Sequence, residues 1–583
     1  MKKVVSFLVC CAFVLCATAG YAEVKNPDTF IKATVSTVRS IDPAAAYDMA
    51  SMQKVENIYE KLIVFDGPYT DKFLPLLAEE VPSLENGGIS ADGKTYTFKL
   101  RKGIKFQQGG DLTPEDVEYS IERVMVLDQN GGPAWMLLEA LTGSDTTTDK
   151  DDQIIPGIFE AIMNSVEVQG DSIVFHLPNP YPPFLGLMAK SWASITDKEW
   201  VIEQGGWDGT LENAPKHHRP NSGDEVLHHI ANGTGPYFMK AWEPSKEFVF
   251  ERFEEYWGPK PALKYAIFKY VPEWSTRKLM LVNGDVDSAT VEDQYVKEMM
   301  EIPGLTMYKL PQLAISCAMF CQKIDTTGNP YIGSGQLDGA GIPPDFFTDI
   351  NVRKAFLHAF DRDVYAEDVL QGISIVPSNP IVQGLPYAID VPVYEFDLEK
   401  SAEYMKKAWD GQVWEKGFKM TIMYNTGNTM REAAAVMLAE NIMSLNPKFQ
   451  IEVGDMQWRD YLNQYRQFRF PVSLISWVGD YPDPHNFAHP FMHSNGSHGR
   501  YLGMPSPETD AMITEGISTT DPLKRAEIYE KLQHLWYEKA IGLGVYQSTE
   551  VRFYRDWVKG FVGNPLDAGD TEWLFRLSKE EPK

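Results

Sequence analysis

A carboxylate follows an apolar stretch in the sequence LISWVGDYPDPHNF, at residues 474–487. The apolar run ends at Gly479, and Asp480 comes next, followed by a segment that contains two prolines. Because proline fixes the backbone angle φ, the carboxylate would be held in place before any ligand arrives. Asp480 is therefore either a cap of its own surface turn or an anchor for a cationic group of a ligand. Asp483, directly before Pro484, suits the turn-capping role better.

Histidines recur every four residues from the end of this segment, at His485, His489 and His493, with His498 close behind. On a helix, side chains four residues apart share a face and could chelate a metal ion. Pro490 interrupts the run, however, and no cysteine or carboxylate cluster in its neighbourhood completes a set of ligands. We therefore expect solvated histidines near the mouth of a cleft, with no metal site and no cofactor.

The common sequence patterns of enzymes are missing from the chain. It contains no G-x-S-x-G, H-E-x-x-H, G-x-x-x-x-G-K-[ST] or G-x-G-x-x-G. Acidic residues are so frequent that pairs of carboxylates carry no weight as catalytic candidates. We predict no catalytic residues, and a secreted hydrolase stays open as the alternative from a different functional class.

The composition limits the possible partners. The chain has 583 residues, of which 44% are hydrophobic, and this is typical of a globular protein with more than one domain. Its net charge of −27 disfavours nucleic acid as a partner, because phosphates bind to basic surfaces. An acidic surface mildly favours cationic or zwitterionic ligands, although it also serves simple solubility.

The first 22 residues have the pattern of a secretory signal peptide. Lys2 and Lys3 precede an apolar run, and small residues stand before Glu23. The run is shorter than the ~20 residues of a membrane-spanning helix, so we expect a soluble protein exported to the periplasm. A lipoprotein anchor is a weaker fit, because no cysteine of the segment follows a small residue.

Two cysteines, Cys317 and Cys321, remain in the mature chain. If their segment is a strand, they share one face about 13 Å apart at ~3.3 Å per residue, which is too far for a direct disulfide. We expect buried small residues; their oxidation state stays open.

Strand and helix signals alternate irregularly along the chain, which predicts an α/β or α+β protein in several lobes. Strands are expected at 95–100, 172–177, 248–250 and 474–478, and helices at 113–125, 349–362, 430–445 and 521–540. The helix patterns include Thr113 and Asp521 as N-terminal caps, each followed by proline. We also expect Arg353 and Lys354 on a solvated helix face.

Several segments, taken together and in this order, resemble the family 5 solute-binding proteins of ABC importers, which include oligopeptide and dipeptide binders. They are VENIYEKLIVFD (55–66), FLPLLAEEVP (73–82), YTFKLRKGIKFQQGGDLTPEDVEYSIERV (96–124), YPPFL (181–185), NGTGPYFMKAW (232–242), ERFEEYWG (251–258), LVNGDVDSA (281–289), DINVRKAFLHAFDRD (349–363) and SWVGDYPDPHNF (476–487). The resemblance covers nearly the whole mature chain. Within it, we expect GTGPY to form a tight turn in which Gly233 and Gly235 adopt unusual dihedrals.

The resemblance implies the class II, two-lobed periplasmic-binding-protein fold, in which a hinge closes the lobes around a ligand. Lobe I would comprise residues 23–310 and 546–583, with an extra subdomain at about 66–190, and lobe II residues 311–545. Two strands would cross between the lobes, near 311–318 and 543–548. An ABC permease and ATPase are implied as partners, and we expect a monomer.

By the same resemblance, Asp480 matches the acid that takes the α-ammonium group of a peptide. We expect Tyr481, Trp477, Gly479 and Tyr47 to join it in ligand binding. Some dipeptide-specific relatives supply an arginine for the peptide carboxylate shortly after the stretch that matches 371–386. This chain has no arginine there; the nearest are Arg362 and Arg431. Dipeptide specificity is therefore in doubt, and longer peptides, metal chelates, haem, oligosaccharides and a role in signalling stay open.

Overall fold

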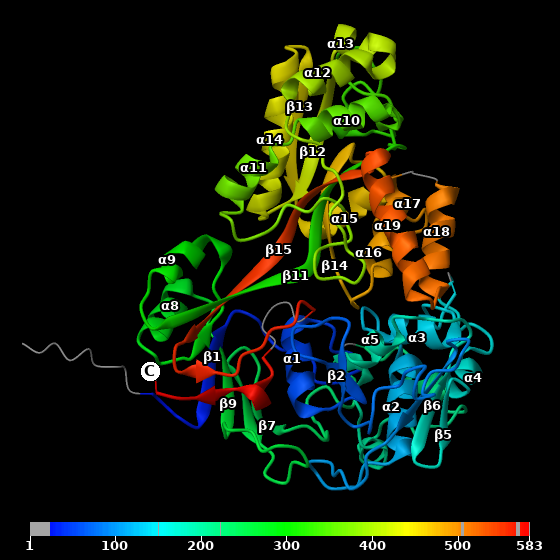
Figure 1. Ribbon diagram of the computed structural model, residues 1–583, viewed down its shortest axis with the longest axis vertical. Coiled ribbons are helices and arrows are strands. Elements are labelled where there is room, and N and C mark those ends of the chain that lie inside the picture. Colours follow the sequence, from blue (N-terminus) through cyan, green and yellow to red (C-terminus); the bar gives the residue numbers. More distant parts are fainter. Residues whose placement is uncertain (1–23, 150, 222, 503–505, 567–571, 582–583) are drawn as a thin grey trace, which may run out of the picture.

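The computed structural model describes residues 24–149, 151–221, 223–502, 506–566 and 572–581. The predicted signal peptide, residues 1–22, lies outside these ranges. Among the helices of the described residues, none combines the length and apolar character that crossing a membrane requires. The chain forms two lobes of mixed α/β structure, which confirms the predicted fold class (Figure 1).

A mixed sheet runs through both lobes and contains ten strands of the described residues. The edge of the sheet that begins with β13 (Phe449–Met456) belongs to the upper lobe of Figure 1, and the edge that ends with β7 (Tyr237–Glu243) belongs to the lower lobe. In order across the sheet, the strands are β13 (Phe449–Met456), β12 (Phe418–Asn425), β14 (Val472–Val478), β11 (Leu305–Phe320), β15 (Gly542–Arg555), β10 (Ser288–Ala289), β1 (Thr29–Thr34), β9 (Tyr265–Tyr270), β8 (Glu247–Arg252) and β7 (Tyr237–Glu243).

The two long strands β11 and β15 connect the lobes (Figure 1). They pair antiparallel from Leu305 opposite Arg555 to Met319 opposite Gly542, with a break in register after Pro311. Both segments that were expected to cross between lobes lie within these strands. The predicted lobe boundaries also fall inside them and stay predictions.

The lower lobe consists of the β1 end of the sheet and, at the right of Figure 1, a smaller unit. The smaller unit has a three-stranded antiparallel sheet in the order β4 (Thr95–Lys99), β6 (Ser172–His176), β5 (Val166–Gln169). A short hairpin, β2 (Ile63–Phe65) with β3 (Phe73–Pro75), precedes it. The helices of this lobe are α1 (Met49–Ile58), α2 (Pro114–Leu127), α3 (Ala134–Thr142), α4 (Ile158–Met163), α5 (Phe184–Met188), α6 (Lys198–Glu203), α7 (Ala214–His217), α8 (Trp274–Val282) and α9 (Val296–Met300).

The upper lobe packs helices around the β12–β14 part of the sheet. They are α10 (Ile350–His358), α11 (Arg362–Val364), α12 (Leu398–Lys407), α13 (Gln412–Lys416), α14 (Thr429–Leu445), α15 (Trp458–Arg466), α16 (His485–Met492), α17 (Gly499–Leu502), α18 (Pro507–Ser518) and α19 (Pro522–Glu538). A short pair, β16 (Val558–Lys559) with β17 (Ser578–Lys579), forms after β15.

The helix starts follow the sequence signals. Thr113 caps α2, with Pro114 as its first residue, and the N–H of Thr113 donates to the Asp116 carboxylate at 2.8 Å. Asp521 caps α19 by accepting from the N–H of Leu523 at 3.0 Å. These two contacts satisfy backbone groups at helix starts, and this is why the local signals were sufficient.

The prediction of a solvated Arg353 is wrong. Arg353 lies on α10 with 6% of its surface exposed. Its guanidinium donates to the carbonyls of Lys539 and Ala540 at 3.0 Å each, where α19 has just ended. The last carbonyls of a helix have no partner within the helix, so a buried arginine from a distant segment satisfies them.

The reason given for the glycines of GTGPY is also wrong. Neither Gly233 nor Gly235 has a positive φ. A Cβ atom on either would stand 2.2 Å or 2.6 Å from the carbonyl oxygen of Ile58, which accepts from the N–H of Gly235 at 2.9 Å. The turn needs glycine because α1 approaches its backbone closely.

Cys317, in β11, and Cys321, directly after this strand, are both buried and are not joined by a disulfide. Burial raises the pKa of Cys321 to about 12 and that of Cys317 further still. The interpretation of these cysteines as buried small residues is confirmed.

Candidate ligand-binding site

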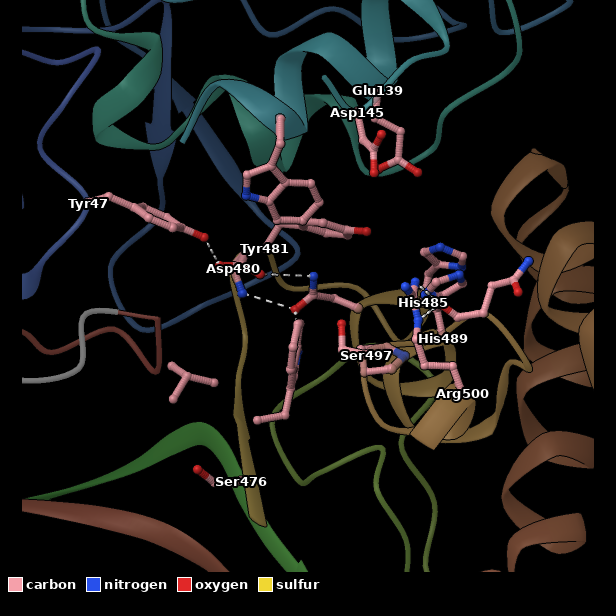
Figure 2. Close-up of a pocket in the computed structure, with 16 residues that line it drawn as sticks. Tyr47, Glu139, Asp145, Ser476, Asp480, Tyr481, His485, His489, Ser497 and Arg500 are labelled. Carbon is pink, nitrogen blue, oxygen red and sulfur yellow. Dashed lines mark hydrogen bonds between the residues drawn. The ribbon is translucent and has the colours of Figure 1, made fainter. Parts of the chain in front are cut away.

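A cavity of about 510 Å³ lies between the two lobes, a volume typical of small-ligand sites (Figure 2). The lower lobe contributes the segment before α1 and the helix α3, and the upper lobe contributes the end of β14 and the segment through α16 and α17. The lining residues used below are Tyr47, Trp135, Glu139, Asp145, Trp477, Asp480, Tyr481, His485, Asn486, His489 and Arg500. Four of the five residues predicted to bind ligand are among them.

Asp480 stands just beyond the end of β14, and three contacts fix its position. Its N–H donates to Oδ1 of Asn486 at 3.0 Å, and Nδ2 of Asn486 reaches its Oδ2 at 3.5 Å. The hydroxyl of Tyr47, from the other lobe, donates to Oδ1 of Asp480 (Figure 2). Asn486 also accepts from Nε1 of Trp477 at 3.1 Å, so one amide orients two of the predicted site residues.

The carboxylate of Asp480 is held where water is scarce. Burial raises its pKa above the ordinary value, while the hydrogen bonds from Tyr47 and Asn486 and the charge of Lys190 act in the opposite direction. No ion pair of the described residues includes Asp480. Since the ionised form of a partly buried carboxylate is favoured by a nearby positive charge, a cationic ligand would stabilise Asp480.

Asp483, three residues further on, has a different environment. Both of its oxygens accept from the guanidinium of Arg525 on α19, at 2.8 Å each, and both side chains are buried. Its Oδ1 also accepts from the N–H of His485 at 2.9 Å, which confirms that Asp483 caps its own turn. No sequence signal pointed to Arg525, because this partner lies on a distant helix.

Tyr481 joins the lobes. It is 2% exposed, and its hydroxyl lies within hydrogen-bond distance, 3.4 Å, of the Tyr181 hydroxyl in the lower lobe. Gly479 is not among the lining residues of the described cavity. Its N–H donates to the carbonyl of Leu313 on β11 at 2.7 Å, and a Cβ there would stand 2.9 Å from the ring of Phe487. Gly479 therefore allows close packing where the strand ends.

The prediction of solvated histidines is wrong. His485 begins α16 with 7% of its surface exposed, and burial lowers its pKa well below the usual value. Burial also lowers the pKa of His489 to about 4, and its ring lies 4.5 Å from that of His493 between centroids. His485 and His489 line the cavity as neutral imidazoles near pH 7.

Among the described residues, Asp116, Asp197 and Glu199 have ligand atoms within 4.8 Å of one another and so could hold a metal ion. None of the three lines the cavity. Asp116 and Asp197 accept from the backbone N–H groups of Lys198 and Trp200 at 2.8 Å and 2.9 Å. The carboxylates of Asp116 and Asp197 lie close together because both accept hydrogen bonds from backbone N–H groups at the start of α6.

The two arginines considered from the sequence are occupied elsewhere. Arg362 donates to the carbonyls of Val376 and Pro377 at 2.9 Å and 2.8 Å, and the buried Arg431 donates to Oγ of Ser316 at 3.0 Å. Neither lines the cavity, but Arg500 of α17 does; its residue is exposed, and its Nε donates to the carbonyl of Asn495 at 2.9 Å. Sequence reasoning missed Arg500 because it looked only near the stretch that matches arginine-containing relatives.

Residues 72–499 match the model of the bacterial extracellular solute-binding proteins, family 5 Middle. The chain is 26% identical over 573 residues to the dipeptide-binding protein of Escherichia coli K12, with 94% of this chain and 91% of the relative covered. It is 24% identical over 572 residues to heme-binding protein A of Haemophilus influenzae, with 94% and 92% covered.

Among solved structures, the periplasmic binding protein DppA of Helicobacter pylori in complex with the peptide STSA has a TM-score of 0.67 at 22% identity, with 95% of this chain and 98% of that chain covered. NikA of Brucella suis in complex with Fe(III)-EDTA has a TM-score of 0.72 at 19% identity, with 95% and 100% covered. These likenesses support the two-lobed fold. From the family match, the chain belongs to the bacterial extracellular solute-binding proteins of family 5.

Proposed function

We propose that this protein captures a peptide or a similar amine-bearing ligand between its lobes and delivers it to an ABC importer. The observation that carries the proposal is Asp480, a partly buried carboxylate on the cavity wall that no ion pair of the described residues includes. The family membership and the peptide-binding relatives support it. The periplasm is the proposed location, and a permease and an ATPase are the proposed partners.

An ammonium group that enters the cavity loses water, at a cost of several kcal/mol. The carboxylate of Asp480 replaces that water with charge-assisted hydrogen bonds, and little ordering remains to be done because Asn486 already holds it. Tyr47 and Asp480 come from different lobes, so closure of the hinge brings the Tyr47 hydroxyl onto the anchor.

The opposite charge of a peptide has a partner in Arg500, which replaces the arginine that the sequence did not offer near 371–386. Trp477 and Tyr481 form walls beside the anchor. In this scheme the ligand is bound and released unchanged, and the chain acts as a monomer. Lobe I is assigned residues 23–310 and 546–583, and lobe II residues 311–545.

A metal chelate or haem is the second candidate ligand. It is favoured by His485 and His489, whose neutral rings line the cavity, 5.3 Å apart between centroids. The similarity to heme-binding protein A supports the same candidate. A chelator that abolished retention of the ligand would favour this candidate over a peptide.

Native mass spectrometry of the purified protein distinguishes these functions, because solute-binding proteins often retain their ligand during purification. We expect masses above that of the chain that disappear on denaturation and fragment as peptides. A single metal complex, haem or sugar would refute the peptide proposal, and conversion of an added peptide to products would identify an enzyme.

A further inference from the structure

Two adjoining cavities lie beside β11 and β15, the strands that connect the lobes. The larger, of about 520 Å³, is lined by residues of both strands and by the loop that leads into α14. The smaller, of about 330 Å³, is lined by segments of both lobes, before α9 and after α11. The two share the lining residues Ser374, Thr429 and Met430 and are therefore adjacent, and we call them together the hinge cavity.

The hinge cavity is distinct from the cavity at Asp480. The two have no lining residue in common among the described residues. In Figure 1, α9 and α11 lie to the left of the connecting strands, whereas α16, which lines the cavity at Asp480, lies to their right. A molecule in the hinge cavity can therefore contact both lobes without contacting Asp480.

Hydroxyl and amide side chains make up most of the wall of the hinge cavity. Those used below are Ser374, Asn425, Asn428, Thr429, Tyr546 and Ser548. No lysine, arginine or histidine of the described residues lines this cavity. Its two carboxylates, Glu292 and Glu550, each pair with an arginine that is not part of the wall, Arg277 and Arg552. The wall is therefore polar but carries little net charge.

Some of these groups are held in place and still have hydrogen-bonding capacity. Oγ of Ser374 accepts from the N–H of Thr549 at 3.1 Å. The hydroxyl of Tyr546 accepts from Nδ2 of Asn428 at 3.3 Å, and this contact ties the loop before α14 to β15. Because each hydroxyl here accepts from a neighbour, it keeps its own hydrogen to donate to a ligand. Little ordering of the wall remains to be done when a ligand binds.

Other groups of the wall are open to solvent. Ser548 on β15 is partly exposed, Thr429 at the start of α14 is exposed, and their hydroxyls form no hydrogen bond within the described chain. Oδ1 of the partly exposed Asn425 accepts from Nη1 of Arg431 at 2.5 Å, and its Nδ2 remains to donate. The hinge cavity thus offers both donors and acceptors that a ligand can reach.

We propose that the hinge cavity binds a neutral molecule rich in hydroxyl groups, of the size of a monosaccharide or disaccharide. Hydroxyl groups donate and accept, which matches a wall of hydroxyls and amides, and the larger part alone has a volume typical of small-ligand sites. A charged group would lose its hydration there without gaining a counterion. The cavity at Asp480 has the opposite chemistry, because Glu139, Asp145 and Arg500 line it. This proposal does not depend on the proposed peptide-binding function.

The test is calorimetric titration with three sugars that share one ring: N-acetylglucosamine, which is neutral, glucosamine, which is cationic, and glucuronic acid, which is anionic. The proteins are the wild type and four variants, Thr429→Phe, Ser548→Ala, Asp480→Asn and the control Thr514→Phe. Thr429 lines both parts of the hinge cavity, so a phenylalanine there takes up space that the ligand needs. Thr514→Phe places the same ring on an exposed position of α18 that lines neither cavity.

We expect N-acetylglucosamine to bind the wild type about tenfold more tightly than either charged sugar, because burial of an unpaired charge opposes binding. Thr429→Phe should abolish this binding, and Ser548→Ala should weaken it about threefold, as loss of one hydrogen bond does. Asp480→Asn and Thr514→Phe should leave it unchanged. Thermal melts check that each variant is folded, and if Thr429→Phe is not, Ser548→Ala decides.

Four results would overturn the proposal: no binding of N-acetylglucosamine, equal binding of a charged sugar, loss of binding in Asp480→Asn, or unchanged binding in Ser548→Ala. Competition with tetraalanine gives a further check. Displacement of the bound sugar by this peptide would make the hinge cavity an extension of the peptide site and would also overturn the proposal. Failure of tetraalanine to bind at all would contradict the peptide function and leave the hinge cavity as a sugar site.

Discussion

Replacing Asp480 by asparagine should separate ligand binding from stability. The substitution keeps the size of the side chain and leaves an oxygen to accept from Tyr47, but it removes the negative charge. Loss of one partner of a buried charge pair costs roughly 2–5 kcal/mol. Because the asparagine of this variant would still accept hydrogen bonds, we expect about 3 kcal/mol, which weakens binding of a free-amine peptide roughly 150-fold.

The melting temperature of the ligand-free protein should not fall in the same variant. The folded-state pKa of Asp480 is raised above the unfolded value, so its stability contribution is present below the unfolded pKa and is lost as pH rises through the folded pKa. At neutral pH the ionised group therefore opposes folding, and Asp480→Asn removes that opposition. The matched control Asp483→Asn breaks the buried ion pair with Arg525 and should lower the free energy of unfolding by about 3–5 kcal/mol.

The assay is titration calorimetry with one peptide and its N-acetylated form, accompanied by thermal melts of both variants. The wild type should prefer the free amine strongly, and Asp480→Asn should bind both forms alike, because acetylation removes the charge that Asp480 recognises. If Asp480→Asn kept the preference for the free amine, or lost stability as much as Asp483→Asn, Asp480 would be a structural residue and the reasoning would fail.

Three further predictions follow from the structure. Affinity for a free-amine peptide, followed by titration at several pH values, should decline as pH falls through the raised pKa of Asp480, whereas a decline that persists in Asp480→Asn would point to another group. Glu60 is buried and accepts hydrogen bonds from Thr234, Tyr256 and Trp257, and burial raises its pKa to about 7. Its contribution to the free energy of unfolding should therefore be greatest below pH ~4.5 and should be lost as pH rises to about 7. Urea denaturation at several pH values should show that the free energy of unfolding changes less with pH in Glu60→Gln than in the wild type. Cys317 and Cys321 should react with a thiol reagent at pH 8 only after unfolding, and rapid labelling of the native protein would contradict their burial.

The sequence was sufficient to predict those features that depend only on residues close to one another along the chain. The caps at Thr113 and Asp521, the strand that ends at Val478 and the turn at Asp483 depend on backbone groups within a few residues. The sequence could not supply the burial of Arg353 and His485, because both depend on how distant helices pack. Gly235 shows the same limit: glycine was expected for its dihedral freedom, yet the requirement comes from α1.

Asp480 and Asp483 show what the sequence by itself determined and what only the tertiary structure decided. The sequence placed both acids in one loop, after an apolar strand and beside two prolines, and marked Asp480 as a candidate anchor. The tertiary structure brought Arg525 of α19 to Asp483, and Tyr47 of the other lobe to Asp480. Whether a buried carboxylate is satisfied or awaits a ligand depends on the charges within a few ångströms of it, and in this protein those charges come from segments that are far apart along the chain.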